Sequence, residues 1–472
     1  MSALGLELGV AALFVVVLVG GLLRGRNAPH AIGGIAIAGL TVLLGAAFLM
    51  SPAPAGEGAF GGMFVQDDLA LFAKRLFLAA TLIGVLASLA LRQAAFSRRA
   101  VEYHLALLGS LLGMLVLASA RDLILLFVAF ELMSIPLYFL TGFLKREPEA
   151  VEAALKFFLV GTVSSAVLVY GLSFVYGIAR TTDMSAIPGA LAEGHPVMLL
   201  GMILTLAGLG FKIAAFPFHM WVPDAYEAAS TPFVAWLSVA PKAAGFLVIF
   251  RLYLEGVGDA VLLWVPMMAG LAVVTIVAGN LMAIPQQNVK RMLAYSGVAH
   301  IGYMLVGLAA VSAAGVGMML FYLVAYLFGN MGAFLVVEAV AQAEGSEHMS
   351  AYRGLAQRSP LLALAMLLFL LSLGGIPFVA GFWAKLYVFL AAAEQGLYWL
   401  VLVGALLTVV ALFYYLLVAK RMYIDAPVRP GPIAVARPLG LSILICTLGV
   451  VVMGVWPGPW VDAVLRIAAT LF

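Results

Sequence analysis

Long apolar runs recur from one end of this sequence to the other, and each is about 18 residues or longer. A helix of that length crosses the roughly 30 Å hydrocarbon core of a membrane. Hydrophobic residues make up 65% of the chain and charged residues 10%, whereas a soluble domain carries about 25% charged residues. The sequence therefore predicts an all-α integral membrane protein, without a sizeable soluble domain.

Polar breaks divide the chain into a series of predicted spans. We expect about fourteen of them, centred at about residues 13, 40, 80, 110, 132, 165, 207, 243, 271, 303, 327, 377, 410 and 447. Short breaks such as "LKREPEA" and "QQNVKR" contain proline or charge, as turns between helices do. An even number of spans would place both termini on the same side of the membrane.

The basic residues of the connections predict which side that is. The odd-numbered connections hold roughly fifteen of them and the even-numbered ones about six. The first group is Arg24, Arg26, Arg92, Arg98, Arg99, Lys145, Arg146, Lys290, Arg291, Arg353, Arg358, Lys420, Arg421, Arg429 and Arg437, and the second is Lys74, Arg75, Arg121, Arg180, Arg251 and Arg466. Because cytoplasmic loops are rich in Lys and Arg, we expect both termini outside.

Four lysines fall inside predicted spans, namely Lys156, Lys212, Lys242 and Lys385. A charge at the centre of a bilayer costs roughly 2.5 to 3.5 kcal/mol, so such residues face the interior of a helix bundle and line pathways. Lys212 lies about fifteen residues into its span, roughly 22 Å at 1.5 Å per residue, which is too deep for easy snorkelling. These lysines predict a route for ions or protons.

Two prolines predict broken helices beside these lysines. Pro217 follows Lys212 in "GFKIAAFPFHMW", and Pro377 lies in "GGIP" within the segment that bears Lys385. Proline removes a backbone donor and clashes with the carbonyl group four residues earlier. Because broken helices inside membranes line hydrated cavities and mark ion sites in transporters, we expect both segments to admit water.

A buried lysine near a carboxylate can exchange a proton when the carboxylate moves or titrates. Glu131, near the middle of its predicted span, is the candidate carboxylate, although it could instead be a purely structural ion-pair partner. His219 and His300 lie in apolar runs and have side chains that can relay protons. His219 could instead be an interfacial residue, because it is close to the tryptophan-bearing end of its segment.

The lysines themselves have an alternative interpretation. Lys212, Lys242 and Lys385 could be structural groups held by carbonyl oxygens. Glu152 precedes Lys156 by four residues, so this pair could be an ordinary ion pair on a helix surface.

Nucleotide and redox motifs are missing from the sequence. It contains neither G-x-G-x-x-G after a strand nor G-x-x-x-x-G-K-[ST]. Cys446 is the single cysteine, which excludes an internal disulfide, a Cys-ligated iron–sulfur cluster and a thiolate zinc site. We therefore expect no cofactor, metal or nucleic acid on this chain, so its energy source must lie in partner proteins.

Several segments resemble a known family. They are "FELMSIPLYFLTGF", "EAALKFFLVGTVSSAVLVYGLSFVYG", "GFKIAAFPFHMWVPDAYEAASTP", "APKAAGF" and "NVKRMLAYSGVAHIGYMLVGLA". Together they are similar to the antiporter-like subunits of respiratory complex I, the proton-pumping NADH:quinone oxidoreductase. The resemblance covers most of residues 100–425, and "APKAAGF" and "TVSSAVLVYGLSFVYG" are more similar to subunit N than to its paralogues M and L.

The resemblance implies a fold of fourteen helices with two inverted five-helix repeats, each containing a broken helix. It implies an N-terminal three-helix segment (1–100), an antiporter-like core (101–425) and a C-terminal helix (426–472). It implies neighbouring membrane-arm subunits as partners, with FMN, iron–sulfur clusters and quinone bound by partner subunits, in a bacterial cytoplasmic (inner) membrane.

The resemblance also implies roles for individual residues. Glu131 and Lys212 would form the coupling pair, Lys242 the central relay and Lys385 the terminal exchange site. Lys156 is a further matching lysine, and His219 and His300 would be relays.

Two other functions remain open at this point. A subunit of a multi-subunit cation/proton antiporter would share the lysines and broken helices but use an ion gradient in place of quinone reduction. A membrane scaffold would not transport ions, so its lysines could be replaced without effect on pumping.

Overall fold

The computed structural model describes residues 4–24, 29–53, 58–187, 196–258, 261–429 and 431–472. Every named secondary-structure element within these ranges is a helix, which confirms the predicted all-α fold. The chain divides into two compact units, each of which combines separate stretches of sequence.

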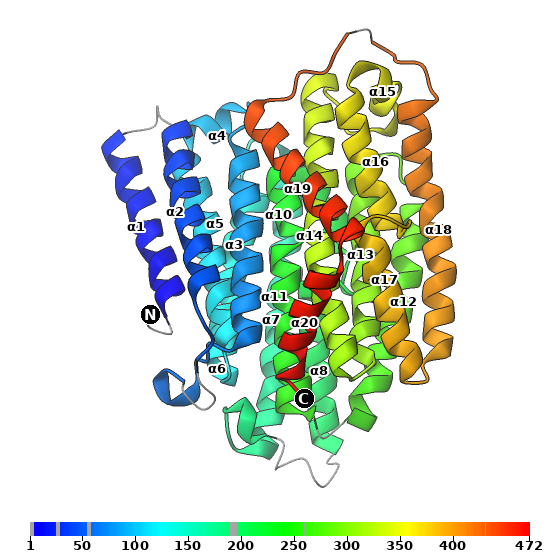
Figure 1. Cartoon of the computed structure of the whole chain (residues 1–472). Coiled ribbons are helices and arrows are strands. Elements are labelled where there is room, and N and C mark those ends of the chain that lie inside the picture. Colours follow the sequence, from blue (N-terminus) through cyan, green and yellow to red (C-terminus); the bar gives the residue numbers. More distant parts are fainter. Residues whose placement is uncertain (1–3, 25–28, 54–57, 188–195, 259–260, 430) are drawn as a thin grey trace. The chain divides into compact units, whose positions relative to one another are not determined.

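Unit 1 comprises Met1–Ile213 and Ala240–Trp264. Its main helices are α1 (Gly5–Arg24), α2 (Pro29–Leu49), α3 (Asp68–Ser88), α4 (Ala94–Arg98), α5 (Ala100–Ser119), α6 (Leu123–Thr141), α7 (Pro148–Ala179), α8 (Pro196–Ile213) and α11 (Ala240–Phe250), with the π-helix η5 (Arg251–Gly256). Helices α1, α2, α3 and α5 pack side by side (Figure 1).

Unit 2 comprises Ala214–Val239 and Val265–Thr470. Its helices are α9 (Trp221–Ala228), α10 (Thr231–Leu237), α13 (Val289–Ala309), α14 (Ala313–Glu344), α15 (Leu355–Arg358), α16 (Pro360–Gly374), α17 (Ala380–Glu394), α18 (Tyr398–Tyr423), α19 (Arg437–Val455), α20 (Gly458–Ala469) and most of α12 (Val261–Ala283). The long helix α14 packs against α10, α13, α16, α17, α19 and α20, and so forms the centre of this unit.

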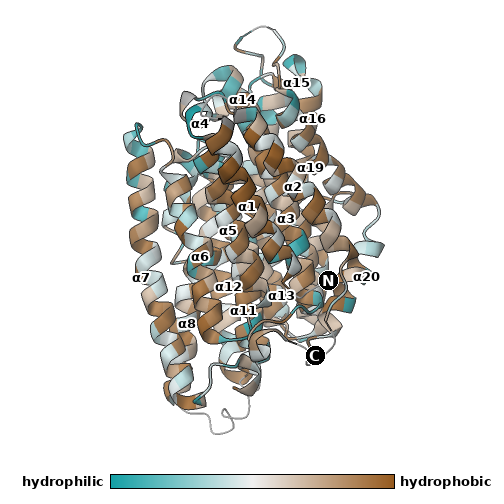
Figure 2. Cartoon of the chain, turned by 90° about the vertical axis from the view of Figure 1, so that its left-hand side faces the viewer, coloured by the Kyte–Doolittle hydropathy of each residue, from teal (hydrophilic) through white to brown (hydrophobic). Residues whose placement is uncertain are grey.

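Thirteen helical segments of the described chain are long and apolar enough to cross a membrane. Figure 2 shows hydrophobic residues along the middle of the helices and hydrophilic residues at ends such as the one beside α4. The fourteenth predicted span, centred at about residue 377, consists of two helices of 15 residues each, the apolar α16 and the less apolar α17. Neither is long enough to cross a membrane by itself.

The predicted break at Pro217 is confirmed. Helix α8 ends at Ile213, which is the residue whose carbonyl group the ring of Pro217 would meet in a continuous helix. Ala214 then takes the left-handed conformation with φ of 65°, and the next helix begins only at Trp221.

The break near Pro377 is confirmed as well. Helix α16 ends at Gly374, and the chain passes through Gly375 with φ of 78° before α17 begins at Ala380. Glycine adopts this backbone conformation without steric cost. Pro377 has no backbone N–H, so it cannot donate a hydrogen bond to the carbonyl group of Leu373, four residues earlier.

A third break, which the sequence analysis missed, lies beside Lys242. Helix α10 ends at Leu237 and α11 begins at Ala240, and Pro241 stands four residues after the end of α10. The same clash between a proline ring and the carbonyl four residues earlier explains its position.

Glycines allow α7 and α8 to pack closely within unit 1. A Cβ atom added to Gly171 on α7 would lie 2.5 Å from the backbone nitrogen of Thr205 on α8. One added to Gly208 on α8 would lie 2.8 Å from the carbonyl oxygen of Ser164 on α7. Small residues permit such close contact between helices inside membranes. This packing fixes α8, and with it Lys212, against α7.

Charged residues attach α9 to the start of α13 in unit 2. Arg291 binds Asp224 at 3.1 Å and Glu227 at 2.7 Å. Lys290 donates to the carbonyl oxygens of Glu227 at 3.2 Å and Ala229 at 2.7 Å. These bonds hold the short helix that follows the Pro217 break.

Candidate functional site

Glu131 lies half-buried on α6, and its carboxylate is held by the next helix. The Ser165 hydroxyl on α7 donates a hydrogen bond of 2.5 Å to Oε1 of Glu131. Asp122 caps the start of this helix, because its side chain accepts hydrogen bonds from the backbone amides of Ile124 and Leu125. This cap sets where α6 starts, and so places Glu131 nine residues further along.

Lys212 lies in the last turn of α8 and is only 2% exposed. Its Nζ atom is 4.9 Å from the ring centre of Phe130 and 5.9 Å from that of Tyr138. In the part of the chain that the structure describes, this Nζ has no hydrogen-bond partner. Aromatic faces attract a cation without providing a hydrogen-bond acceptor, so they compensate its desolvation only in part.

Glu131 and Lys212 lie close enough for their charges to interact, although the two residues form no direct ion pair in the described structure. Phe130, the residue before Glu131, provides the ring nearest to the Lys212 ammonium group. The predicted pair of Glu131 and Lys212 is therefore brought together within unit 1, at a separation longer than a salt bridge.

Lys242 lies on α11, which packs against α8, and is 2% exposed. Gly245, one turn further along α11, faces the aliphatic part of Lys212: an added Cβ atom would lie 3.5 Å from Cγ of Lys212. Residues three positions apart share one side of a helix, so Lys242 and Lys212 lie on packed faces of neighbouring helices. Unit 1 thus contains three of the predicted residues in one region.

Lys385 belongs to unit 2 and is buried beside the break between α16 and α17. Its Nζ atom donates a hydrogen bond of 2.9 Å to the carbonyl oxygen of Leu373. It also lies 4.5 Å from the ring centre of Tyr303 on α13. In an intact helix, the Leu373 carbonyl oxygen would accept a backbone hydrogen bond. Because the helix is broken here, this oxygen is available as an acceptor for Lys385.

Tyr303 connects Lys385 to a buried polar network. The Tyr303 hydroxyl accepts hydrogen bonds from Thr408 at 3.3 Å and from Nδ2 of Asn280 at 3.4 Å. Oδ1 of Asn280 accepts from the Tyr414 hydroxyl at 2.9 Å. The hydroxyl groups of this network can both donate and accept a hydrogen bond, whereas the Asn280 amide between Tyr303 and Tyr414 orients them without relaying a proton.

His300 lies in a second part of this network and has a tyrosine at each ring nitrogen. Nδ1 is 2.8 Å from the Tyr322 hydroxyl and Nε2 is 3.2 Å from the Tyr415 hydroxyl. Tyr415 is also hydrogen-bonded to Ser296. The rings of His300 and Tyr303 lie 6.0 Å apart, which places this histidine next to the residues around Lys385.

His219 lies in the break that follows α8, as its sequence position implies. Its Nε2 atom is 3.3 Å from the sulfur of Met282, and its ring packs against Phe216 and Tyr295. A thioether is a weak acceptor and cannot supply a proton. In the described chain, no hydrogen bond connects His219 with the network around His300.

Lys156 lies on an exposed part of α7, apart from the buried lysines. Its Nζ atom is 2.7 Å from Glu152 one turn earlier, and the two side chains are 49% and 67% exposed. This geometry corresponds to the ordinary surface ion pair that the sequence left open.

A buried ion pair in the N-terminal part of unit 1 was missed. Lys74 and Arg75 were expected in a connection, which is wrong, because both lie within α3, and Lys74 is fully buried. Its Nζ atom is 2.8 Å from Glu7 on α1, 3.3 Å from Oε1 of Gln66 and 4.9 Å from the ring centre of Phe64. A glutamate near the start of the first helix was the only sequence signal.

Arg251 was also expected in a connection, and this is wrong as well, because it is buried in η5 at the end of the candidate span Thr231–Gly256. Its guanidinium group donates to Oδ2 and Oδ1 of Asp67 at 2.6 and 2.8 Å and to Glu255 at 2.5 Å. Burial by itself would raise the pKa of Asp67, but the charges of Arg251 and Arg121 hold the pKa below its ordinary value.

Within the described ranges, no group of three or more His, Cys, Asp or Glu side chains could hold a metal ion. The candidate site consists of buried lysines, a carboxylate and hydroxyl groups. These groups can hold and exchange protons.

Residues 120–411 match the family described as NADH:quinone oxidoreductase/Mrp antiporter, TM. A protein from Moorella thermoacetica named NADH-quinone oxidoreductase subunit N is 41% identical over 481 residues, which cover 100% of this chain and 99% of that protein. A protein of the same name from Heliobacterium modesticaldum is 41% identical over 477 residues, again with 100% and 99% covered.

Solved structures have the same fold. A chain of respiratory complex I from Thermus thermophilus with bound aureothin superposes with a TM-score of 0.83 at 31% identity, and 97% of this chain and 99% of that chain are covered. A chain of the Mrp complex from Dietzia sp. superposes with a TM-score of 0.89 at 22% identity, with 100% and 98% covered. At the lower identity the similarity concerns the fold alone.

Proposed function

Because this chain belongs to the NADH:quinone oxidoreductase/Mrp antiporter family of membrane subunits, we propose that its buried lysines carry protons across the membrane. Its relatives at 41% identity are named NADH-quinone oxidoreductase subunit N, so the chain is an antiporter-like subunit of the membrane arm of complex I. In this role it acts as part of a translocase and performs no redox step itself.

The proposal depends above all on Lys212. An ammonium group that is 2% exposed, without a hydrogen-bond partner in the described chain, is costly in a membrane. Charged residues inside membrane spans are rare, and those that occur line pathways for ions or protons. The nearby Glu131 carboxylate stabilises the charged form of Lys212, so displacement or protonation of Glu131 would promote loss of a proton from the lysine.

Lys242 is the proposed next proton carrier in unit 1. It lies on α11, whose Gly245 packs against Lys212. Two neighbouring cations repel each other in a medium of low dielectric constant. Loss of a proton from Lys212 would therefore make the protonated, charged form of Lys242 more favourable. Glu131, Lys212 and Lys242 therefore form one coupled set.

Lys385 is the proposed exchange site in unit 2. The Leu373 carbonyl oxygen holds its ammonium group, and Tyr303 lies against it. The Tyr303 hydroxyl, and His300 with the hydroxyls of Tyr322 and Tyr415, supply groups near Lys385 through which a proton can enter or leave. The route through unit 2 does not need His219, whose contacts are a thioether and aromatic rings.

The driving energy would come from quinone reduction in partner subunits, which would bind FMN, iron–sulfur clusters and quinone. We further propose that the two broken segments belong to two inverted five-helix repeats, and that the chain lies in a bacterial cytoplasmic membrane with both termini outside. The excess of Lys and Arg in the odd-numbered connections supports this orientation.

A subunit of a cation/proton antiporter is the second candidate function. The Mrp chain superposes well, but its 22% identity supports only a common fold. The relatives at 41% identity carry the oxidoreductase name, and this favours the first candidate. Co-purification with flavin- and iron–sulfur-bearing chains would distinguish it from a purely membrane assembly.

The test is the Lys212→Ala substitution in the assembled complex, reconstituted into vesicles. We expect quinone reductase activity and proton pumping to fall together by about tenfold or more, since one buried charge is worth a few kcal/mol. Lys420→Ala is the matched control, because Lys420 is an exposed lysine at the end of α18. Wild-type rates of both activities in the Lys212 variant would refute the proposal and favour a scaffold.

A further inference from the structure

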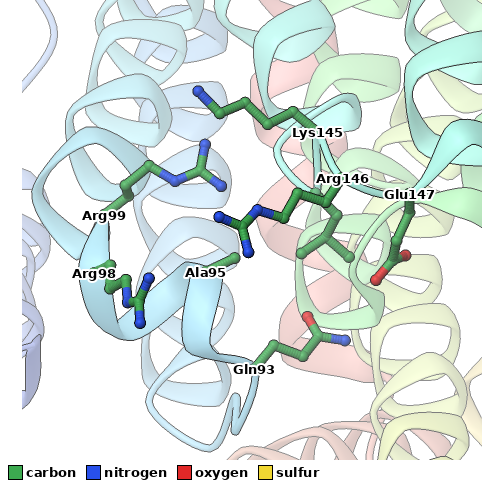
Figure 3. A pocket seen from close by; sticks show the side chains of 8 residues that line it. Gln93, Ala95, Arg98, Arg99, Lys145, Arg146 and Glu147 are labelled. Atoms are coloured by element: carbon green, nitrogen blue, oxygen red, sulfur yellow. The ribbon is translucent and has the colours of Figure 1, made fainter.

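A basic cavity of about 300 Å³ lies in unit 1 where the segment around α4 meets the connection between α6 and α7 (Figure 3). Its lining includes four cationic side chains and a single carboxylate, namely Arg98, Arg99, Lys145, Arg146 and Glu147. None of these residues belongs to the proposed proton route. The excess of positive charge points to an anionic ligand.

Phe143 holds the side chain of Arg99 in place. Its Nη2 atom donates a hydrogen bond of 3.0 Å to the carbonyl oxygen of Phe143, and its guanidinium group lies 4.8 Å from the ring centre of the same residue. Figure 3 shows the guanidinium groups of Arg99 and Arg146 pointing into the same space, while Glu147 points away from them. Two cations that face one space repel each other unless an anion lies between them.

Aromatic rings pack beside Arg99, next to the residues that line the cavity. The ring of Phe143 stacks on Phe96 at 5.0 Å and meets Tyr103 edge-on at 5.3 Å. This buried aromatic cluster holds Arg99 in position at the edge of the cavity.

Exposed apolar side chains continue from the cavity along the neighbouring helices. On α6 these are Phe139 and Ile135, which are 49% and 60% exposed, and on α7 they are Val151 and Leu155, which are 39% and 54% exposed. Phe139 also contacts the ring of Phe143 at 5.8 Å. A ligand with a charged head and apolar tails matches this surface, whereas a soluble anion would use only its upper part.

We propose that the cavity binds the phosphate group of an anionic membrane phospholipid, with its acyl chains along α6 and α7. The cavity holds about ten times the roughly 30 Å³ that a water molecule occupies in the liquid, which is enough for a phosphate and part of the glycerol. Guanidinium groups bind phosphate oxygens in a bidentate manner. Basic pockets between transmembrane helices bind lipid headgroups in this way.

The test uses the purified complex and a phosphatidylglycerol that carries a diazirine near the top of one acyl chain. Labelled peptides are then identified by mass spectrometry. We expect labels within residues 93–99 and 143–151. The variant combines Arg98→Gln, Lys145→Gln and Arg146→Gln, three exposed residues that form no ion pair in the described chain. It leaves Arg99 intact, because that residue supports the local fold.

Each cation near an anionic lipid contributes about fivefold to affinity, so the triple variant should lose labelling by at least about tenfold. The control combines Lys420→Gln, Arg429→Gln and Arg437→Gln, which are three exposed cations of unit 2, and should label as the wild type does.

Three results would overturn the proposal. Equal labelling by the neutral phosphatidylcholine analogue would mean that charge does not matter. Loss of labelling on addition of inorganic phosphate would identify a site for soluble anions. A carbodiimide cross-link from Lys145 to another subunit, in place of a lipid label, would identify an acidic protein partner. All three readouts are independent of proton pumping.

Discussion

The ammonium group of Lys385 is hydrogen-bonded at 2.9 Å to the carbonyl oxygen of Leu373, the one that Pro377 leaves without a backbone donor. One sequence feature, the proline, therefore provides both the break in the helix and the acceptor for the lysine. The cost of the lost backbone hydrogen bond is offset by a charge-assisted bond at the same oxygen.

Two substitutions of Lys385 distinguish holding a charge from exchanging a proton. Lys385→Met removes the donor to Leu373, and Lys385→Arg retains a donor that stays protonated in proteins. If exchange at this position is essential, pumping should fall by about tenfold or more in both variants. Vesicle acidification assays measure this effect. Normal pumping by the arginine variant would show that the charge alone is sufficient.

Ser165→Ala should weaken function without abolishing it. The variant loses the hydrogen bond to the Glu131 carboxylate, and a hydrogen bond to a charged group is worth roughly 1.5 to 3 kcal/mol. We expect an intermediate pumping rate and a shifted infrared carboxylate band, which Glu131→Gln would identify by removing it. Ser165→Thr keeps the hydroxyl and should restore both. An unchanged band in the alanine variant would argue against a positioning role for Ser165.

The buried pair of Glu7 and Lys74 should behave as a unit in stability measurements. Glu7→Gln or Lys74→Met leaves the other charge buried without its partner, at a cost of roughly 3 to 5 kcal/mol. The double variant should be much closer to the wild type, because no uncompensated charge remains. The midpoint of thermal inactivation of the purified complex measures this. Additive effects of the two substitutions would contradict a coupled pair.

The lowered pKa of Asp67 predicts how the stability of unit 1 changes at acidic pH. Its pKa is lowered in the folded chain because Arg251 and Arg121 outweigh the effect of burial. The stabilisation is therefore complete above the unfolded value of about 3.9 and declines as the pH falls through the lower folded value. Asp67→Asn should be less stable at neutral pH, and its stability should depend less on pH below about 4. Parallel acid-denaturation curves would contradict this assignment.

Much of the fold was predictable from the sequence because its determinants are local. Apolar length gave the spans, and Pro217 and Pro377 gave the breaks to within a few residues. Proline is nevertheless insufficient as a signal: Pro136 lies inside α6 without ending it, and Pro241 ends α10 at a break that was not predicted. The outcome depends on whether tertiary contacts hold the helix together around the proline.

The polar networks were less predictable because they join residues far apart in the chain. Lys74 was placed in a connection since basic residues concentrate there, and only its partner on α1 reveals why it is tolerated inside a helix. The tyrosines around His300 were not predicted as its partners, because the sequence does not show which group a hydroxyl will contact. The sequence predicted which lysines are buried in the membrane, because a lysine within an apolar run is conspicuous. Only the structure showed which residues surround them.

Helix α7 has a mechanical consequence for the charge pair. Its Ser165 holds the acid on α6, and its Ser164 and Gly171 form the seam with α8, which bears the base. Helix α7 thus positions both Glu131 and Lys212. Any displacement of α7 therefore acts on the positions of both Glu131 and Lys212, because α7 contacts the helix that bears each of them.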